Sequence, residues 1–351
     1  MRRFTALLFC ICLTLPARAE ILIGVAGPLT GQNAAFGNEL RVGAAAAIAD
    51  VNAGGGINGE TLAILEGDDA CDAKRAAEVA KTFISRDVRM VVGHFCASAS
   101  LAAAAAYTNA GILMFNPSVT ASDLTSKNLW NVFRLTGRDD AQGEFAATRI
   151  KAEGQASAVY VITDGQSDTA GMAKRFMNVL PGTIVITVKP GAVKLPEEPG
   201  LIVASAVYLA LQATDAADAA KTIRTLNTTA PIYGPDFLQS ENYLARASDA
   251  SNGTRVSFLQ DNAFLANAAK RAKLSQIDGA TLTSYAAVEV FVAAAKARSV
   301  NESRAMASYL TTGSEVTTII GPLRFNAAGD LQQQPYVWYR WSNGVLAPDN
   351  P

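Results

Sequence analysis

One segment, Met90 to Thr120, constrains the fold more than any other part of the chain. It reads MVVGHFCASASLAAAAAYTNAGILMFNPSVT, an apolar β-branched run followed by an alanine-rich stretch and a second apolar run. The two runs predict short buried strands, and the stretch between them predicts a helix that ends near Gly111. Such a βαβ unit requires two parallel strands in a sheet that is covered by helices.

The carboxyl ends of these two strands predict a binding site. Ligands of such sheets bind at this edge, where helix N-termini present unpaired N–H groups to anions. Ala97 and Ser98 follow the first strand, and Ser118 and Thr120 follow the second. We therefore expect a site for a carboxylate or a phosphate, while the hydroxyls of Ser118 and Thr120 fit an ordinary turn equally well.

Residues 1–19 predict a secretory signal peptide. Arg2 and Arg3 precede an apolar stretch from Phe4 to Leu15, and the sequence from Pro16 to Ala19 has the A-x-A pattern of a cleavage site. The apolar stretch is too short to span a membrane. We expect cleavage before Glu20, export to the periplasm, and a mature protein without a membrane anchor.

Cleavage would leave a slightly acidic chain with two cysteines. The signal peptide holds three of the 30 Lys and Arg residues and none of the 31 acidic residues, so 27 basic residues remain against 31 acidic ones. No basic cluster predicts nucleic-acid binding. The remaining cysteines are Cys71 and Cys96, and in an exported protein such a pair is more often a disulfide than a metal or catalytic site.

Strands and helices alternate along most of the chain. Expected strands at Ile21 to Ala26 and Leu62 to Glu66 are separated by an expected helix at Asn38 to Val51. The alternation restarts at Ala158, so a second α/β lobe is expected. An apolar stripe predicts a long helix at Thr281 to Ala297.

Two regions depart from this alternation. The connection from Lys189 to Gly200 holds three prolines, so the next strand, expected at Leu201 to Val207, would follow without a crossover helix. Near the C-terminus, Leu323 to Phe325 and Tyr336 to Trp341 predict the two strands of a β-hairpin.

Catalytic and metal sites find little support in the sequence. His94 is the single histidine and lies two residues from Cys96, so a Cys–His pair in an exported hydrolase is one hypothesis, the least favoured. A G-x-S-x-G motif is absent, and one histidine excludes a histidine-rich zinc site. Asp68, Asp69 and Asp72 fit a loop and a helix cap better than a calcium site. We expect no enzyme activity, no metal and no cofactor.

Seven motifs together resemble the exported leucine/isoleucine/valine-binding proteins of ABC transporters, which have the type I periplasmic binding fold. They cover nearly all of the first lobe and the hinge: ILIGVAGPLTGQNAAFG (21–37), ADVNAGGGINGETL (49–62), GDDACD (67–72), VVGHFCASAS (91–100), GILMFNPSVT (111–120), FRLTGRDDAQG (133–143) and IIGPLRFNAAGD (319–330). The resemblance implies two doubly wound parallel-sheet lobes joined by a three-crossover hinge.

The resemblance also implies the limits of the lobes. Residues 20–137 and 262–325 would form lobe 1, and residues 138–261 and 326–351 would form lobe 2. The crossovers would fall near Gly137 to Asp139, Ser257 to Asp261 and Phe325 to Gly329. An amino acid would be held between the lobes and enclosed when the hinge closes.

In lobe 1 the resemblance implies a disulfide and the carboxylate half of an amino-acid site. Family members join the cysteines that correspond to Cys71 and Cys96. The ligand carboxylate would be received by Thr120 and by the backbone N–H of Ala97, which stands where the family has a hydroxyl residue. Ser98 would replace that hydroxyl if the loop shifts.

Two further residues of lobe 1 would face the ligand. Ser118 lies where the family offers a backbone carbonyl to the ligand amine, and Phe36 matches an aromatic residue that covers the ligand.

In lobe 2 the resemblance implies the ammonium half of the site. Asp236, which follows Gly-Pro, matches an acidic residue that meets the ligand ammonium but is one methylene shorter; by itself it also fits a turn. Asp168 stands where the family has a tyrosine, and Tyr208 lies near a second tyrosine position. A family phenylalanine falls near Ala280. The extra carboxylate and the missing aromatic favour a larger or more polar amino acid than leucine.

These observations predict a monomeric periplasmic solute-binding protein that passes an amino acid, branched-chain or related, to the membrane permease of an ABC transporter. The alternative is a periplasmic sensor for an amide, urea or an amino acid, which would signal to a protein partner.

Overall fold

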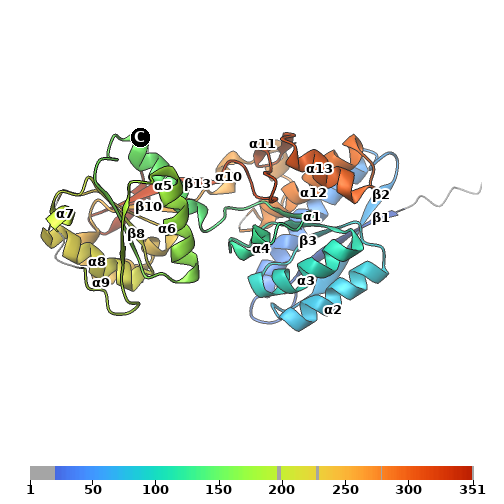
Figure 1. Ribbon diagram of the computed structural model, residues 1–351. Coiled ribbons are helices and arrows are strands. Elements are labelled where there is room, and N and C mark those ends of the chain that lie inside the picture. Colours follow the sequence, from blue (N-terminus) through green and yellow to red (C-terminus); the bar gives the residue numbers. More distant parts are fainter. Residues whose placement is uncertain (1–19, 196–198, 227–228, 278, 350–351) are drawn as a thin grey trace, which may run out of the picture.

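The structure, a computed structural model, describes residues 20–195, 199–226, 229–277 and 279–349. Two α/β lobes lie side by side and are joined by three chain segments (Figure 1). This confirms the predicted fold class. The predicted signal peptide, residues 1–19, lies outside the described residues. Within the described ranges, no helix is both long and apolar enough to cross a membrane.

The first lobe is built on a five-stranded parallel sheet in the order β2-β1-β3-β4-β5. The strands are β1 (Glu20–Gly27), β2 (Thr61–Asp68), β3 (Met90–Gly93), β4 (Leu113–Asn116) and β5 (Val132–Arg134). The helices of this lobe are α1 (Ala34–Ala53), α2 (Ala73–Ser85), α3 (Ala97–Ala110), α4 (Asp123–Ser126), α10 (Asn262–Leu265), α11 (Ala268–Arg271), α12 (Thr281–Ala297) and α13 (Ser303–Thr311). A small hairpin pairs β11 (Val316–Thr318) with β12 (Gly321–Leu323).

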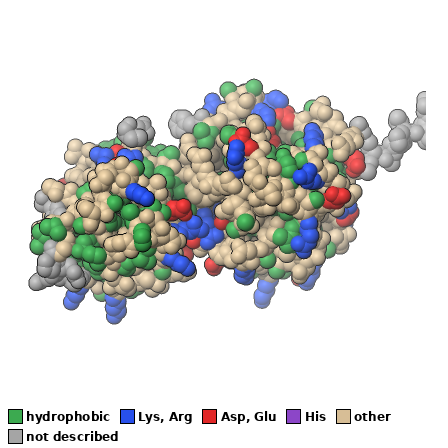
Figure 2. All heavy atoms as spheres, turned by 45° about the horizontal axis from the view of Figure 1, so that its top comes forward, with side chains coloured by type: hydrophobic (Ala, Val, Ile, Leu, Met, Phe, Trp, Pro, Cys, Tyr) green, Lys and Arg blue, Asp and Glu red, His purple; other side chains and the backbone are tan. Residues whose placement is uncertain are grey.

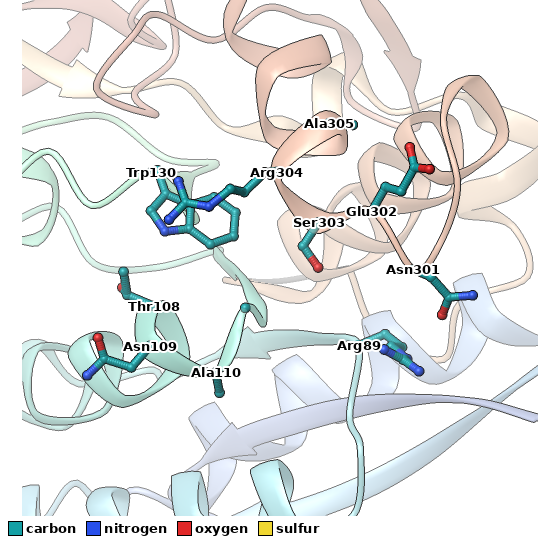
Figure 3. A pocket seen from close by; sticks show the side chains of 11 residues that line it. Arg89, Thr108, Asn109, Ala110, Trp130, Asn301, Glu302, Ser303, Arg304 and Ala305 are labelled. Atoms are coloured by element: carbon teal, nitrogen blue, oxygen red, sulfur yellow. The ribbon is translucent and has the colours of Figure 1, made fainter.

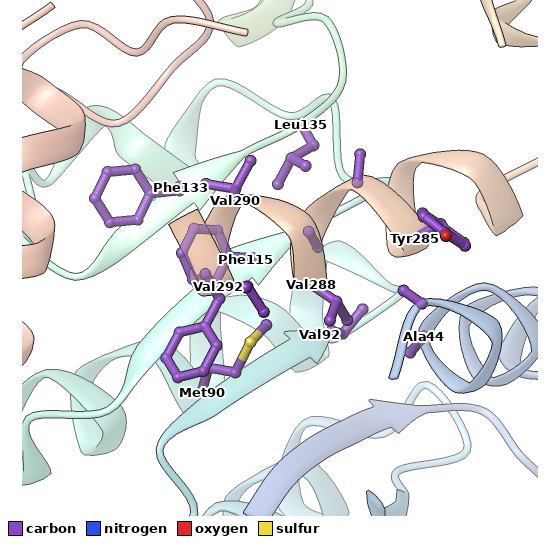
Figure 4. Close-up of a cluster of buried hydrophobic side chains, with 14 of the residues drawn as sticks. Ala44, Met90, Val92, Phe115, Phe133, Leu135, Tyr285, Val288, Val290 and Val292 are labelled. Carbon is purple, nitrogen blue, oxygen red and sulfur yellow. The ribbon is translucent and has the colours of Figure 1, made fainter. Parts of the chain in front are cut away.

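Helix α12 fills the centre of the first lobe although it comes from a distant part of the sequence. Its bounds are those predicted from the apolar stripe. Val290 lies beside the aromatic side chains of β4 and β5, and Val288 lies beside Val92 of β3 (Figure 4). The rings of Phe115 and Phe133 are 5.3 Å apart. Because α12 is buried on nearly all sides, it holds the sheet and α1 as one rigid body.

The second lobe has a seven-stranded sheet in the order β14-β13-β10-β9-β8-β6-β7, in which β13 and β14 run antiparallel to their neighbours. The strands are β6 (Val159–Thr163), β7 (Ile184–Thr187), β8 (Ala206–Ala210), β9 (Ile232–Gly234), β10 (Arg255–Leu259), β13 (Tyr336–Ser342) and β14 (Val345–Pro348). The helices are α5 (Ala141–Ala152), α6 (Ser167–Val179), α7 (Pro199–Ile202), α8 (Ala213–Leu226) and α9 (Glu241–Ala247), with 3₁₀ turns η1 (Asp236–Gln239) and η2 (Ser248–Ser251).

The predicted C-terminal hairpin is wrong. Strand β12 pairs with β11 in the first lobe, whereas β13 pairs with β10 and β14 in the second. The turn between them folds back on the first lobe, because Phe325 and Leu331 pack in its core. Gly329 adopts a positive φ of 87°, and a Cβ there would lie 2.0 Å from the carbonyl oxygen of Val132. Only glycine permits this close approach to β5.

Two other predictions for the second half need correction. The strand expected at Leu201 begins later, at Ala206, because Leu201 belongs to α7. The third crossover lies at residues 332–335, later than expected, since Leu331 still packs in the first lobe and β13 begins at Tyr336.

A buried charge network fastens the crossovers to one another. Arg134, which is fully buried, donates from Nε to Asp330 at 2.9 Å and from Nη1 to the carbonyl oxygen of Val119 at 2.5 Å. Arg138 donates to the other oxygen of Asp330 at 3.1 Å. Figure 2 shows basic and acidic side chains together at the junction of the lobes. Asp330 is thus the shared counter-charge of two arginines.

We expect Asp330→Asn to lower the free energy of unfolding by about 3–5 kcal/mol, because Arg134 would stay buried without its counter-charge. Urea denaturation measures the change. Glu315→Gln is the control, since it removes an exposed pair with Arg324 and should cost less than about 1 kcal/mol. Equal losses in the two variants would contradict the role given to Asp330.

Candidate functional site

A cleft of about 540 Å³ opens between the lobes at the carboxyl edge of the first sheet. Phe36, Phe95, Ser118 and Thr136 line it, and each follows a strand of that sheet. The opposite wall comes from the end of β10 and the crossovers. This is the edge at which ligands of parallel α/β sheets bind.

The first turn of α1 and the loops after β3 and β4 form one wall of the cleft. The rings of Phe36 and Phe95 stack with centroids 4.7 Å apart, and Phe36 remains 42% exposed. Ser118 donates its hydroxyl hydrogen to the carbonyl oxygen of Phe95 at 3.1 Å. Buried Asn116 also holds the two loops together, because its Nδ2 donates to the carbonyl oxygen of His94 and its Oδ1 accepts from the N–H of Val119.

The N-terminus of α3 presents unpaired N–H groups. The cap residue is Cys96, and its side chain accepts no hydrogen bond from the first turn. Ala97 and the exposed Ser98 are the first two residues of the helix. Cys96 is joined to Cys71 in a disulfide, as predicted, with the two Cα atoms 5.3 Å apart. This helix end can therefore receive an anion.

The structure does not support a Cys–His nucleophile. The sulfur of Cys96 is committed to the disulfide. His94 is fully buried, with Nδ1 2.6 Å from Asp69 and Nε2 3.0 Å from the hydroxyl of Tyr107. Asp69 thus partners the histidine, and Asp72 caps α2 by accepting from two N–H groups.

On the second lobe, Asp236 begins the turn that follows β9. Gln142 of α5 holds it, because its Nε2 donates to Asp236 Oδ1 at 3.1 Å and its Oε1 accepts from the Asp236 N–H at 3.0 Å. Ser257 donates to the same amide oxygen at 2.7 Å. Burial raises the pKa of Asp236. The carboxylate is therefore oriented by amide and hydroxyl groups and has no cation beside it among the described residues.

Asp139 of the first crossover lies close to Asp236. Its N–H donates to the carbonyl oxygen of Thr120 at 3.0 Å, and its carboxylate accepts from the Thr120 hydroxyl. Burial, then the charges of Asp236 and Asp168, raise the pKa of Asp139 to about 6, although Thr120 and Arg134 act in the opposite direction. The charges of Asp236 and Asp168 thus oppose the ionisation of Asp139.

Two buried tyrosines lie near the carboxylates of Asp139 and Asp236. Tyr208 stacks on Phe176, and Tyr336 lies over Gly137, where a Cβ would approach its hydroxyl to 2.8 Å. Neither hydroxyl has a hydrogen-bond partner among the described residues. Burial raises both pKa values, and the charge of Asp236 adds to each shift. Two buried, unsatisfied hydroxyls therefore lie within range of the charge of Asp236.

The predicted residues fall into two groups. Phe36 and Ser118, with Ala280, line the cleft pocket. The second group lies around Asp139, which accepts a hydrogen bond from Thr120 and whose pKa is affected by the charges of Asp236 and Asp168. Tyr208 belongs to this group because the charge of Asp236 affects its pKa. A ligand role for each of these residues stays a prediction.

Sequence reasoning missed three residues that lie around Asp236, namely Asp139, Gln142 and Tyr336. Asp139 lies in a motif that was assigned to the hinge alone, and its two adjacent acidic residues were the available signal. Tyr336 was assigned to a hairpin. Gln142 gave no signal beyond its place in that motif.

A second pocket, of about 620 Å³, lies at the opposite edge of the first sheet (Figure 3). Its lining includes Arg89 before β3, Gly111 before β4 and Trp130 before β5. The guanidinium of Arg304 lies over the Trp130 ring, 4.4 Å from its centroid. Because this is the amino edge of the strands, we do not take it as the candidate site.

We expect Asp139→Asn to stabilise the unliganded protein at pH 7.5, by at most about 3 kcal/mol. The folded-state pKa of about 6 lies above the ordinary value of 3.8, so the folded protein binds this proton more tightly, and wild-type stability rises as pH falls through 6. The gain of the variant should therefore shrink as pH falls from about 6 and be nearly lost below the ordinary pKa of 3.8. Urea denaturation at several pH values measures it.

The control for this prediction is Asp249→Asn, at an exposed aspartate of η2 that has no ion pair among the described residues. Its effect on stability should be small and nearly constant between pH 4 and pH 7.5. A gain for Asp139→Asn that does not depend on pH would contradict the assigned pKa.

The chain is similar to known proteins over nearly its whole length. The periplasmic binding protein family matches residues 20–345. The Leu/Ile/Val-binding protein homolog 1 of Brucella abortus is 33% identical over 344 residues, which cover 94% of this chain and 92% of the relative. The Leu/Ile/Val-binding protein BraC3 of Rhizobium johnstonii is 30% identical over 344 residues, with 94% of each chain covered.

Solved structures show the same fold. A putative branched-chain amino acid ABC transporter from Rhodospirillum rubrum has a TM-score of 0.71 at 24% identity, over 94% of this chain and 100% of that one. The substrate-binding protein LivJ of Streptococcus pneumoniae, in complex with isoleucine, has a TM-score of 0.58 at 24% identity, over 93% of this chain and 98% of that one.

Proposed function

We propose that this chain, which belongs to the periplasmic binding protein family, is the solute-binding component of an amino-acid ABC transport system. Its relatives carry the name of Leu/Ile/Val-binding proteins, and a similar solved structure holds isoleucine. The proposal covers export to the periplasm, a monomeric state, and delivery of the ligand to a membrane permease. Binding proteins of this kind need no catalytic step.

The opposite polarity of the two lobes is the observation that carries this proposal. Lobe 1 offers the uncapped N-terminus of α3, which favours a negative group. Lobe 2 offers Asp236, a buried carboxylate that no described cation pairs. An α-amino acid carries a carboxylate and an ammonium on one carbon, so it bridges these two faces.

The contacts follow from this orientation. The ligand carboxylate accepts from the N–H of Ala97 and from the hydroxyl of Thr120, which must then leave its hydrogen bond to Asp139. The ligand ammonium donates to Asp236 and to the carbonyl oxygen of Ser118. Phe36, half exposed at the mouth of the cleft, covers the side chain. Charge-assisted contacts of this kind contribute roughly 1.5–3 kcal/mol each.

The contacts come from both lobes, so the ligand stabilises the closed arrangement over the open one. A ligand shifts such an equilibrium only by its difference in affinity for the two states. Most of the binding free energy should therefore depend on groups that meet the ligand from opposite lobes, with the crossovers acting as the hinge.

A thermal-shift screen of the purified protein against all amino acids, short amides and urea tests the function. At least one amino acid should raise the melting temperature, because it binds the folded state alone. No shift by any amino acid, with a shift by an amide or urea, would favour the sensor alternative. No shift at all would contradict the proposal.

The variant Asp236→Ala should weaken binding of that amino acid at least tenfold, since the ligand ammonium loses its charged partner. Isothermal titration calorimetry measures the affinity. Asp249→Ala, which removes an exposed carboxylate of the same lobe, is the matched control and should bind as the wild type does. An unchanged affinity for Asp236→Ala would remove Asp236 from the site.

A further inference from the structure

We propose that the ligand carries a second cationic group on its side chain, and that Asp168 and Asp139 receive it. The substrate class is therefore a basic amino acid, with an amine or guanidinium at the end of its side chain. This inference rests on the proposed function, because it assumes that the α-ammonium meets Asp236.

The lobe 2 face, by which we mean the carboxylates of Asp139, Asp168 and Asp236, carries more negative charge than a neutral amino acid can balance. Asp139, Asp168 and Asp236 form no ion pair with any residue that the structure describes, whereas Asp140, the neighbour of Asp139 in sequence, pairs with Arg138 at 2.6 Å and with Arg175 at 3.0 Å. A neutral amino acid brings one ammonium and one carboxylate into the cleft. It would leave this face with uncompensated negative charge on closure, which is costly in a desolvated site.

Within the described ranges, no arginine near these carboxylates is free to supply the missing charge. Arg134 lies near Asp139, but its guanidinium already donates to Asp330, to the carbonyl oxygen of Val119 and to Thr125. Arg138 is shared between Asp140 and Asp330. The counter-charge must therefore come with the ligand.

Two unsatisfied tyrosine hydroxyls also favour a cationic group. Tyr208 is fully buried and Tyr336 is 6% exposed, and neither hydroxyl has a partner among the described residues. The Tyr336 hydroxyl lies against Gly137, two residues before Asp139. Burial and then the charge of Asp236 raise the pKa of Tyr208, and burial and then the charges of Asp139 and Asp236 raise the pKa of Tyr336, so both tyrosines lie within range of these carboxylates. A phenolic oxygen accepts a hydrogen bond, and an ammonium has three donors and a guanidinium five. A cationic group can thus satisfy tyrosine and carboxylate oxygens together.

Asp168 has no structural use within the described part of the chain. It lies exposed in the first turn of α6 and makes no hydrogen bond there. The residue that orders this turn is Asp164, which accepts from the N–H of Gln166 and from the hydroxyl of Thr169. Asp168 is therefore free to meet a ligand when the lobes close.

An inorganic cation does not fit this face. In the described ranges, no three acidic, histidine or cysteine side chains lie together as metal ligands would. Carboxylates that are spread more widely than one coordination shell suit an organic cation, whose charge lies several bonds away from the α-ammonium.

The test compares lysine and ornithine with norleucine, a neutral amino acid of similar length, by isothermal titration calorimetry at pH 7.5. We expect lysine or ornithine to bind at least tenfold more tightly than norleucine. Asp168→Asn should reduce this ratio of affinities at least tenfold, since it removes the charge that recognises the side chain. Asp249→Asn, with the same change in net charge, should keep the ratio of the wild type.

Each outcome decides a separate point. Tighter binding of norleucine than of lysine and ornithine would overturn the inference and leave the amino-acid function intact. An Asp168→Asn variant that keeps the wild-type preference for the cationic ligands would overturn it as well. If none of the three binds while a different neutral amino acid does, the inference also fails alone. If no amino acid binds, the proposed function fails and the inference with it.

Discussion

The buried interaction of Arg134 with Asp330 determines how the rest of the molecule meets at the hinge. Arg134 ends β5, the last strand before the first crossover, and Asp330 precedes the third crossover. A guanidinium without solvent contact needs its counter-charge, so the two crossovers are held in one relative position. The same arginine lies near Asp139 and opposes the effect of burial on its pKa. The buried ion pair at the crossovers is therefore coupled electrostatically to Asp139.

Asp139 and Asp140 are adjacent in sequence, but the fold gives their carboxylates different partners. Asp140 lies against Arg138 and Arg175, where its charge is used within the protein. Asp139 instead accepts from Thr120 and lies near Asp236, where no described cation forms an ion pair with it. Two adjacent carboxylates thus lie in different electrostatic surroundings, which depend on the partner that the fold places beside each one.

Local patterns predicted the first lobe well because its strands and helices alternate in sequence as they do in space. The same holds for α12, whose apolar stripe is continuous. The C-terminal hairpin failed, because the turn at Gly329 docks on β5 through contacts that no local pattern contains. In the site, Phe36 and Ser118 follow strands and were predicted to lie at the cleft. Asp139 and Tyr336 were not, because their role arises only where the two lobes converge.

Both faces of the cleft differ from the leucine-binding pattern, and both differences disfavour a neutral apolar ligand. In lobe 1, Ala97 stands where the resemblance places a hydroxyl residue, so the proposed ligand carboxylate would have one donor fewer. In lobe 2, Asp168 stands where the resemblance places a tyrosine, so an apolar ligand side chain would lose a packing surface while a cationic one would gain a partner. If the proposed contacts hold, both changes lower the affinity for a neutral branched-chain ligand, and a cationic side chain would recover the loss. The proposal therefore assigns the selectivity of the cleft to the carboxylates of lobe 2 more than to the helix N-terminus of lobe 1.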